Sequence, residues 1–425
     1  MKYAVITFGC RVNQADSLGF EEALLADGAS AAPPEAADLV IVNTCSVTAS
    51  ADQGARQTIR RVARANPGAR IVVTGCYATR RPDELAQLPN VVRVVPNDDK
   101  PRLIPLTRTP TDIGDGPCGA VIEPGVAGRT AFTLRVQTGC AEPCSYCIIP
   151  TTRGEPRSVP VEDVLREVER VVAAGFKEIA LTGVHLGSYG RDLERPASLV
   201  DLLRALDHRA KGLARRAKAL AERGDILFRI SSLEPMDCTD AIVDLVAASP
   251  RFAPHFHLPL QHASNRILSA MRRPYTIERY AALVDRLRAR IAGASIGSDI
   301  IVGFPSETDD DFDQLAAYLE ASPLTHVHVF PYSDRPGTPA SAMVDKVQGI
   351  VVRERARRVR EIGQRLAARF LASQIGTAHR ALTLEDGTLA VTGNYLKVRI
   401  PSGRARNEWV RLRVTSEHHG ELLGS

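Results

Sequence analysis

The chain has 425 residues, of which 44% are hydrophobic, and a formal net charge of +5. This length exceeds one ordinary domain and the apolar content suffices for packed cores, which excludes disordered and fibrous proteins. Its eight cysteines are too dilute for a disulfide scaffold, so metal or redox chemistry in a reducing compartment is the better interpretation. No stretch reaches the roughly 18 apolar residues of a membrane span, and the start MKYAVITFGC is typical of a strand rather than a signal peptide, so we expect a cytoplasmic protein.

The charge is unevenly distributed along the chain. Residues 346–425 carry 15 Lys and Arg against 7 Asp and Glu, whereas the remainder has a net charge of −3. A basic C-terminal end favours a polyanionic partner such as nucleic acid, although a solvated helix face explains part of the excess. A second basic stretch, HRAKGLARRAKALAERG at 208–224, is best interpreted as a solvated helix face, with RNA contact as the alternative.

Short apolar runs alternate with helical patterns over the first hundred residues. The predicted strands are Tyr3–Phe8, Leu39–Asn43, Ile71–Thr74 and Val91–Val95. This alternation predicts an open parallel α/β sheet in an N-terminal domain of residues 1–115. Between residues 100 and 130 the composition changes to Pro, Gly, Thr and Asp, which indicates a linker.

A second β/α series predicts a partial (β/α)6 barrel over residues 126–365. Its predicted strands are Phe132–Gln137, Glu178–Thr182, Ile226–Ser231, His255–Leu260, Ser298–Gly303 and His326–Phe330. Its predicted helices are Val161–Ala174, Leu199–Arg223, Ile277–Ala292 and Asp309–Ala321. The fold class is therefore expected to be α/β.

The C-terminal part has a different pattern. Val352–Phe370 places apolar residues on one helical stripe and its arginines largely elsewhere, which predicts a long basic amphipathic helix. Residues 380–415 show short strand patterns separated by turn signals. We therefore predict a small all-β module over residues 368–425.

Three cysteines are closely spaced directly after the first predicted barrel strand. Cys140, Cys144 and Cys147 form the pattern C-x3-C-x2-C in VQTGCAEPCSYCIIP. Three thiolates in one tight loop can hold three corners of a cubane iron–sulfur cluster and leave one iron open to an exogenous ligand. A structural zinc site is the alternative, but zinc knuckles need a second Cys or His pair nearby, and none follows within about 30 residues.

Three further cysteines share a position rather than a spacing. Cys10, Cys45 and Cys76 each come at the carboxyl end of a predicted strand, in YAVITFGC, LVIVNTC and IVVTGC. Ligands bind at these strand ends in open parallel sheets, so the three thiols should converge on a second metal site. A lone buried cysteine is more often a small hydrophobe, and Cys118 and Cys238, which lack partners at ligand spacing, are assigned no role.

These triads and their surroundings resemble the methylthiotransferase family, radical S-adenosylmethionine (SAM) enzymes that insert a methylthio group into an unactivated C–H bond. The matching motifs span nearly the whole chain: FGCRVNQADS, VNTCSVTASADQGARQTIRRVARANP, VTGCYA, GCAEPCSYCIIPTTRG, IALTGVHLGSYG, RISSLEP, LPLQHASNRILSAMRRPYT, SDIIVGFPSET and HVFPYSDRPGTPA. The resemblance implies two [4Fe-4S] clusters, SAM as a cofactor, a central radical SAM domain and a C-terminal TRAM domain.

The resemblance also implies a division of labour. The cluster on Cys140, Cys144 and Cys147 would bind SAM and generate the radical that takes hydrogen from C2 of an adenine, and the other cluster would present the sulfur. NTCSVT, CSYCIIP, RISSLEP and NYLKV look most like the branch acting on N6-threonylcarbamoyladenosine beside the anticodon in tRNA. The alternatives are isopentenyladenosine in tRNA, an aspartate of a small-subunit ribosomal protein and, remotely, a non-catalytic metal-stabilised RNA-binding protein. We expect a monomer supplied by an electron donor such as flavodoxin or ferredoxin.

Polar residues at the ends of the predicted barrel strands are candidate SAM contacts, with strand capping as the alternative for each. They are Thr182, Gly183, Ser231, Ser232, Glu234, Gln261 and Gly303. Three local departures from the family pattern concern SAM contact. Thr182-Gly183-Val184-His185 stands where many superfamily members carry Gly-Gly-Glu, Ser306 stands where relatives often have Gly, and His262-Ala263 stands where many have Ser-Gly.

The resemblance to TRAM domains implies RNA binding by the C-terminal module. Candidate phosphate contacts are Lys397, Arg399, Arg404 and Arg406. Tyr395 and Trp409 could stack on a base or belong to the core. His255, His257, His326 and His328 alternate along two predicted strands, where hydrogen-bonded interior residues are a better interpretation than metal ligands.

Overall fold

The computed structural model describes residues 1–107, 124, 130–218 and 225–425, without the side chains of 214–218. These residues divide into two compact units. The first holds the described residues of Met1–Ile122 together with Thr138–Pro156 and Ser333–Ser341, and the second holds those of Glu123–Gln137, Arg157–Tyr332 and Ala342–Ser425. Most of the predicted linker, the predicted domain limits at 115 and 126, and Cys118 lie outside the described residues.

The first unit is built on a five-stranded parallel sheet with the order β2-β1-β3-β4-β5. Its strands are β1 (Lys2–Thr7), β2 (Ser30–Ala31), β3 (Leu39–Thr44), β4 (Arg70–Gly75) and β5 (Val91–Val95). The sheet confirms the predicted fold class, although the two-residue β2 was not predicted. Its helical segments are α1 (Arg11–Ala26), η1 (Pro34–Ala36), α2 (Ala49–Ala65), α3 (Cys76–Arg80), α4 (Pro82–Ala86), η2 (Asn97–Arg102) and α5 (Leu103–Thr107).

The central strand β3 is buried along its whole length, and its alternate residues enter two cores. Val40 and Val42 pack with α2, whereas Leu39 and Ile41 pack with α1 on the opposite face. Successive side chains of a strand point to opposite faces of the sheet. Because both faces of this sheet are covered, side chains on both are buried, which explains the continuous apolar run LVIV. Loops at the carboxyl ends of these strands are therefore held by a rigid, doubly covered sheet.

Among the described residues of the second unit, six parallel strands form two three-stranded sheets, β10-β9-β6 and β11-β12-β13. They are β6 (Phe132–Arg135), β9 (Glu178–Thr182), β10 (Leu227–Ile230), β11 (His255–His257), β12 (Ser295–Val302) and β13 (His326–Pro331). A parallel bridge between Phe228 and Phe252 connects the two sheets, which confirms the predicted partial barrel. The strand predicted over Ser298–Gly303 corresponds to β12, which begins three residues earlier than predicted. Gly297 and Ser295 interrupt the apolar pattern on which the prediction rested.

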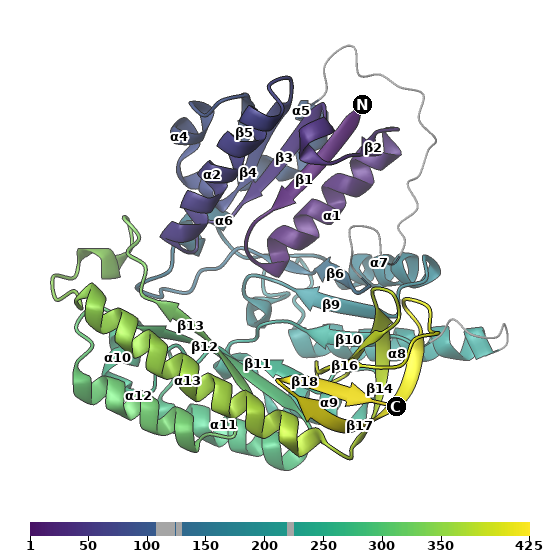
Figure 1. Cartoon of the computed structure of the whole chain (residues 1–425), viewed down its shortest axis with the longest axis vertical. Helices are drawn as coiled ribbons and strands as arrows, with labels where there is room; N and C mark the ends of the chain where they lie inside the picture. The colour runs from purple at the N-terminus through teal and green to yellow at the C-terminus, as the bar shows by residue number, and fades with distance from the viewer. Residues whose placement is uncertain (108–123, 125–129, 219–224) are drawn as a thin grey trace. The chain divides into compact units, whose positions relative to one another are not determined.

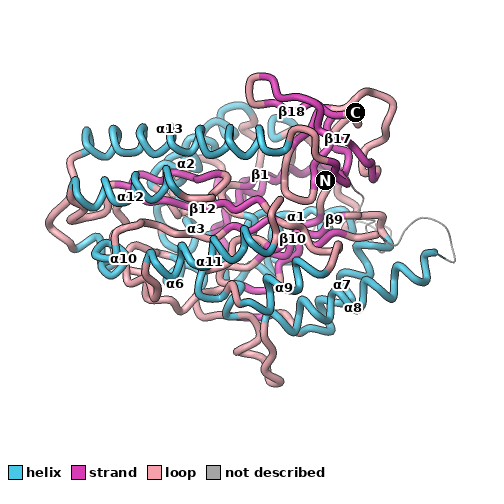
Figure 2. Tube along the Cα trace, turned by 90° about the horizontal axis from the view of Figure 1, so that it is seen from below, coloured by secondary structure: helices cyan, strands magenta, loops and turns pink. Residues whose placement is uncertain are grey.

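Helices cover the outer side of this barrel (Figures 1 and 2). They are α7 (Val161–Ala173), α8 (Leu199–Lys218), α9 (Asp240–Ala248), α10 (Asn265–Ala270), α11 (Ile277–Arg290) and α12 (Asp309–Ala321). Shorter segments are β7 (Gln137–Thr138), α6 (Ile149–Arg153), β8 (Arg157–Ser158), η4 (Leu186–Ser188), η5 (Pro235–Asp237) and η6 (Pro339–Ala342). The predicted end of α8 at Arg223 lies outside the described residues.

The predicted amphipathic helix is α13 (Gly349–Gln374), which begins three residues earlier and ends four residues later than expected. Val359, Ile362 and Leu366 are buried on its inner stripe, and it lies beside α12 and β13 (Figure 2). The predicted boundary between barrel and C-terminal module, at 365–368, falls inside this helix.

The C-terminal module is a closed barrel with the strand order β14-β15-β16-β18-β17. Its strands are β14 (Ala378–Leu384), β15 (Leu389–Thr392), β16 (Lys397–Arg399), β17 (Trp409–His418) and β18 (Glu421–Gly424), around a core that includes Leu396, Val398 and Val414. Arg229 of β10 is fully buried and donates to the carbonyl of Gly393 at 2.9 Å, so the module is anchored to the β/α barrel. No helix among the described residues is long and apolar enough to cross a lipid bilayer.

Candidate metal centres and binding residues

Cys10, Cys45 and Cys76 follow three neighbouring strands of the first unit, as predicted. Cys10 precedes α1, Cys45 comes directly after β3, and Cys76 is the first residue of α3 after β4. Adjacent parallel strands end at one edge of the sheet, so the three thiols come close enough to influence each other's ionisation. Tertiary structure thus assembles three sulfurs that are 35 and 31 residues apart in the chain.

Polar side chains tie these three turns together. The side-chain amide of Asn13 donates to the carbonyls of Phe8 at 2.8 Å and Thr44 at 2.9 Å, which fixes the turns before Cys10 and Cys45. The hydroxyl of Thr44 donates to the carbonyl of Thr74 at 2.6 Å, which joins the turns of Cys45 and Cys76. The geometry is therefore set before any metal is bound.

The environment of these thiols suits a cation. Burial, with smaller contributions from neighbouring Cys76 and Cys10, raises the pKa of the Cys45 thiol to about 11. Metals bind thiolates rather than thiols. A buried thiolate is not stabilised by water, so a bound cation would have to stabilise it instead. Three converging thiols of this kind fit an iron–sulfur cluster better than three isolated core cysteines.

Gly9 leaves room for the Cys45 side chain. Its φ is +91°, and a Cβ built there would lie 2.6 Å from both Cβ and Sγ of Cys45. We expect Gly9→Ala to displace this thiol and to reduce the bound iron from about eight to about four per chain, the content of one cubane. Iron analysis and visible absorption after anaerobic reconstitution measure this. Gly19→Ala in α1, where nothing lies within 4 Å of the added carbon, should retain all the iron and serves as the control.

Cys140, Cys144 and Cys147 lie in the segment Thr138–Pro156, which belongs to the first compact unit. The backbone amide of Cys140 donates to the carbonyl of Gly154 at 3.0 Å, so the loop is closed on itself. A side chain at Gly139, whose φ is +76°, would lie 1.9 Å from the carbonyl oxygen of Glu155. This glycine is therefore required for the closure.

Backbone amides point at two sulfurs of this loop. The amide of Glu142 donates to Sγ of Cys140 at 3.4 Å, and the amide of Ile149 donates to Sγ of Cys147 at 3.5 Å. Amide hydrogen bonds to sulfur are a feature of iron–sulfur ligands, where they offset the negative charge of the thiolates. The three thiols are partly exposed, which leaves access for an exogenous ligand.

A buried charged cluster lies beside the N-terminal triad. Asp16 pairs with Lys100 at 2.6 Å and with Arg153 at 3.4 Å, and all three are at most 7% exposed. The guanidinium of Arg153 also donates to Asn13 Oδ1 at 2.5 Å and to Cys76. Because Arg153 ends α6, which directly follows the Cys140–Cys147 loop in the segment Thr138–Pro156, this cluster connects the two triads within one unit.

Asn97 makes a second connection. Its side-chain amide donates to the carbonyl of Thr152 at 2.7 Å and lies 3.7 Å from Sγ of Cys76. Asp52 forms a further buried pair with Arg335 at 2.9 Å and also binds Arg80. The segment Ser333–Ser341 is thereby joined to α2, and Nε of Arg335 also donates to the carbonyl of Val47, in the loop that follows Cys45, at 3.3 Å.

The candidate SAM contacts all lie at or just after carboxyl ends of barrel strands. Thr182 ends β9 and Gly183 follows it, Ser231 and Ser232 follow β10, and Gly303 follows β12. Gln261 forms a parallel bridge with Ile300 and has a φ of +69°. A non-glycine residue held in this strained region is more common at functional sites, which makes Gln261 the most distinctive of the set.

The side chains of two candidate SAM contacts, Glu234 and Ser232, already interact with other side chains of the protein. Glu234 forms an ion pair with Arg273, and burial raises the pKa of its carboxyl. The hydroxyl of Ser232 is 2.9 Å from Nδ1 of His257. Ser306, which departs from the glycine of relatives, has a φ of +69°, and this explains why glycine is common there.

Exposed ion pairs engage two of the four basic residues predicted to bind RNA, and a third donates to a backbone carbonyl. Arg399 pairs with Glu421 at 2.5 Å and Arg404 with Glu408 at 3.0 Å, and Arg406 donates to the carbonyl of Glu385 at 2.9 Å. Exposed pairs of this kind are weak and can exchange for phosphates. Lys397 is exposed at the start of β16.

The two aromatic candidates differ in their surroundings. Tyr395 stacks on His255 with ring centres 4.9 Å apart and lies under Arg229, so barrel residues hold its ring. Trp409 is covered by the Arg380 guanidinium at 3.8 Å and donates from Nε1 to the carbonyl of Asp225 at 3.1 Å. Both rings therefore already have stacking partners in the protein.

Comparisons with known proteins agree with these features. Residues 2–96 match the family model described as "Uncharacterized protein family UPF0004", and residues 134–319 match that of the "Radical SAM superfamily". The chain is 35% identical to the threonylcarbamoyladenosine tRNA methylthiotransferase MtaB of Bacillus subtilis (strain 168), over 92% of this chain and 88% of the relative. It is 37% identical to the tRNA-2-methylthio-N(6)-dimethylallyladenosine synthase of Chloroflexus aurantiacus, over 88% of this chain and 80% of the relative. The chain belongs to the methylthiotransferase family of radical SAM enzymes.

Among solved structures, the radical SAM methyltransferase TsrM of Kitasatospora setae, with cobalamin and a [4Fe-4S] cluster bound, is similar with a TM-score of 0.54. The alignment covers 80% of this chain and 77% of that chain at 17% identity, so it supports the fold alone. As a methylthiotransferase, this chain uses two [4Fe-4S] clusters and SAM, which confirms the predicted cofactors. The triads fit them, because each offers three sulfurs in one part of the first unit.

Sequence reasoning missed the residues that connect the triads of this methylthiotransferase. Arg153 stands in PTTRG shortly after the loop cysteines, but a single arginine beside a turn is usually a solvated side chain. Asp16, Asn97 and Lys100 carry no local pattern at all. The one available signal was that Asn97 and Lys100 follow the predicted strand Val91–Val95, which belongs to the same sheet as the strands that end in cysteines.

Proposed function

We propose that this methylthiotransferase adds a methylthio group to C2 of N6-threonylcarbamoyladenosine next to the anticodon of tRNA. The observation that supports it best is the pair of three-thiol sites in one compact unit, connected through Arg153. Relatives named as threonylcarbamoyladenosine tRNA methylthiotransferases, which are 35% identical over more than nine-tenths of this chain, support the substrate.

Each part of the chain has a task in this proposal. The clusters supply radical generation from SAM and delivery of sulfur. Cys140, Cys144 and Cys147 hold one cluster and leave an iron open to SAM, while Cys10, Cys45 and Cys76 hold the other. Strand-end groups of the barrel orient SAM: Thr182, Gly183, Ser231, Ser232, Glu234, Gln261 and Gly303.

A second candidate substrate is isopentenyladenosine in tRNA, because the Chloroflexus relative is named for that chemistry at 37% identity. Mass spectrometry of tRNA nucleosides from a deletion strain decides between them. Loss of 2-methylthio-N6-threonylcarbamoyladenosine supports the proposal, and loss of the isopentenyl nucleoside supports the second candidate. If every tRNA nucleoside is retained, both tRNA substrates are wrong and the ribosomal-protein aspartate is the substrate to test.

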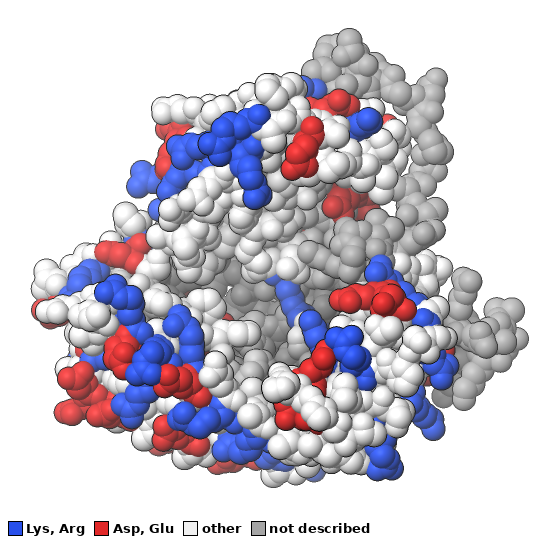
Figure 3. All heavy atoms as spheres, viewed as in Figure 1, with Lys and Arg blue, Asp and Glu red and all other residues white. Residues whose placement is uncertain are grey.

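We further propose that the protein works as a monomer in the cytoplasm, where tRNA is modified, and receives electrons from a flavodoxin or ferredoxin. The C-terminal closed barrel would bind the anticodon stem-loop through Lys397, Arg399, Arg404 and Arg406. Lys and Arg also gather over α2 (Figure 3), where Arg60, Arg61 and Arg64 are exposed. Within the described residues these three arginines have no ion-pair partner.

Charge removal on the C-terminal barrel tests the RNA contact. We expect Lys397→Ala combined with Arg399→Ala to weaken binding of modified and unmodified anticodon stem-loops equally. Loss of two phosphate contacts should flatten the plot of log affinity against log salt by about 1.4 to 1.8 units of slope. Fluorescence anisotropy at several salt concentrations measures this. Arg365→Ala on α13 removes another exposed, paired arginine and should leave the slope unchanged.

A further inference from the structure

The sheet β11-β12-β13 has two faces of different chemistry. Val327 of β13 faces α13, because a Cβ built on Gly363 of that helix would lie 2.8 Å from its side chain. His326 and His328 alternate with Val327 and therefore face away from α13. Gly297 of β12 shares that other face, since a Cβ there would meet His326, and Asp299 follows it at a spacing of two residues.

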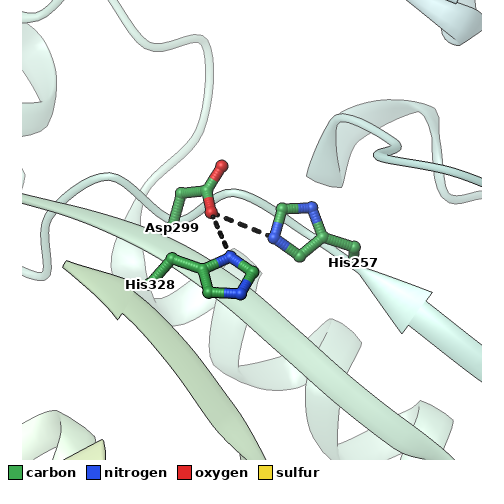
Figure 4. A group of neighbouring side chains, drawn as sticks. All are labelled: His257, Asp299 and His328. Carbon is green, nitrogen blue, oxygen red and sulfur yellow. Dashed lines mark hydrogen bonds and ion pairs between the residues drawn. The ribbon is translucent and has the colours of Figure 1, made fainter. Parts of the chain in front are cut away.

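Three side chains on this polar face form a hydrogen-bonded group (Figure 4). Oδ1 of Asp299 is 3.0 Å from Nε2 of His257 and 3.1 Å from Nδ1 of His328. Ser232 holds the second nitrogen of His257 at 2.9 Å. Asp299 therefore fixes both imidazoles, and His257 has both its ring nitrogens engaged.

Two polar atoms of this group remain open. Nε2 of His328 points away from Asp299 in Figure 4, and the His328 side chain is 58% exposed. Within the described part of the chain, neither this nitrogen nor Oδ2 of Asp299 has a hydrogen-bond partner. The group thus presents one imidazole nitrogen and one carboxylate oxygen to a ligand.

The charges of the group follow from its contacts. Although burial alone would raise it, hydrogen bonds from His257 and His328 hold the pKa of Asp299 at about 2. The hydrogen bond to this carboxylate raises the pKa of His328, whereas burial lowers the pKa of neighbouring His326 to about 4. The hydrogen bond to Asp299 thus favours the protonated form of His328, whereas burial favours the neutral form of His326, and Nε2 of a protonated His328 is a donor.

A charged donor beside an anionic acceptor matches a particular ligand chemistry. A carboxylate accepts hydrogen bonds from the donor, and a hydroxyl on the adjacent carbon donates to the acceptor. The threonyl end of threonylcarbamoyladenosine carries a carboxylate and a hydroxyl on neighbouring carbons. An isopentenyl group carries neither.

We propose that His328 and Asp299 bind the threonyl end of the substrate nucleoside, with His328 Nε2–H donating to its carboxylate and Asp299 Oδ2 accepting from its hydroxyl. His257 is a positioning residue that holds Asp299. This assignment rests on the proposed function and makes the group a determinant of specificity. A site built to hydrogen-bond a polar substrate group rejects an analogue without it, because its own polar atoms then remain unpaired.

The test uses the full chain and three anticodon stem-loops that differ only at the modified adenosine: threonylcarbamoyl, isopentenyl or unmodified. Wild type should bind and methylthiolate the threonylcarbamoyl form best. His328→Leu should reduce this preference over unmodified adenosine at least tenfold and leave affinity for the unmodified stem-loop unchanged. His328→Gln keeps a neutral donor and should retain an intermediate preference. The control is His208→Leu, which makes the same substitution at an exposed histidine of α8 and should change neither the affinities nor the preference.

Binding affinity without SAM, iron content and thermal melting accompany the kinetics, so a misfolded variant is recognised. Full threonylcarbamoyl preference in His328→Leu would overturn the assignment while leaving the proposed function intact. If wild type modifies only the isopentenyl form, the proposed function fails and the assignment falls with it. His257, Asp299 and His328 also have their ligand atoms within 4.8 Å of one another, close enough for a metal ion. One zinc or manganese ion per wild-type chain, absent from His328→Leu, would overturn the assignment in favour of a metal site.

Discussion

Replacing Cys140, Cys144 and Cys147 together by alanine is expected to halve the iron content, from about eight to about four per chain, and to abolish SAM cleavage. Replacing Cys10, Cys45 and Cys76 should halve the iron equally but leave reductive release of 5′-deoxyadenosine from SAM. The difference follows from the roles assigned to the two clusters, because the loop triad is the one expected to hold the cluster that receives SAM. Neither variant should form a methylthio product.

Iron analysis, visible absorption and chromatography of 5′-deoxyadenosine under a strong reductant measure the two outcomes. Cys238→Ala is the matched control. This thiol is buried, no other described cysteine affects its ionisation, and burial raises its pKa to about 12, so it should be inert. Stoichiometric zinc in wild type without SAM cleavage would contradict the assignment of both triads. If only the variant of Cys10, Cys45 and Cys76 lost SAM cleavage, the two triads would have the opposite roles.

Asp16→Asn should destabilise the first unit by about 3–5 kcal/mol, the usual cost of removing one partner from a buried ion cluster. The change leaves Lys100 and Arg153, which repel each other at 7% and 3% exposure, without the Asp16 carboxylate. Burial already lowers the pKa of Lys100, so in the variant this lysine should lose its proton more readily still. The Arg153 contact with Cys76 should weaken together with the cluster.

Chemical denaturation of the anaerobic protein at several pH values measures this effect. A neutral Lys100 relieves the repulsion, so the loss should be greatest at low pH and shrink as pH rises. Asp163→Asn breaks an exposed pair with Arg166, whose side chains are 46% and 71% exposed, and should cost at most about 1 kcal/mol. If the two variants lost the same amount of stability, the buried cluster would contribute no more to stability than a surface ion pair does.

The strands around the sites could be predicted because their patterns are local. LVIVNTC and IVVTGC each show an apolar run that ends at a cysteine, and the structure ends β3 and β4 within one residue of that cysteine. Arg355 shows the limit of such reasoning. It was expected among the solvated arginines of α13, but it is 5% exposed and pairs with Glu307 at 2.6 Å, since helical periodicity does not reveal a distant carboxylate.

The His257, Asp299 and His328 group illustrates the same limit. Alternation along the strands placed His257 and His328 each on one face of its own strand, and hydrogen-bonded interior histidines were the favoured interpretation. The carboxylate that joins them comes from β12, and nothing in SDIIVGF indicates which residue it would meet. Register between parallel strands brought the three together.

The sequence by itself determined the loop triad, because eight contiguous residues contain all three candidate ligands and local chain geometry suffices to bring them together. It also determined that Cys10, Cys45 and Cys76 would converge, because parallel strands end at one edge. Only the tertiary structure decided that Arg153 connects the two triads and that Asp299 joins two histidines. These contacts depend on burying charges from distant segments against each other, and the low-dielectric interior that makes such pairs form exists only once the chain has folded.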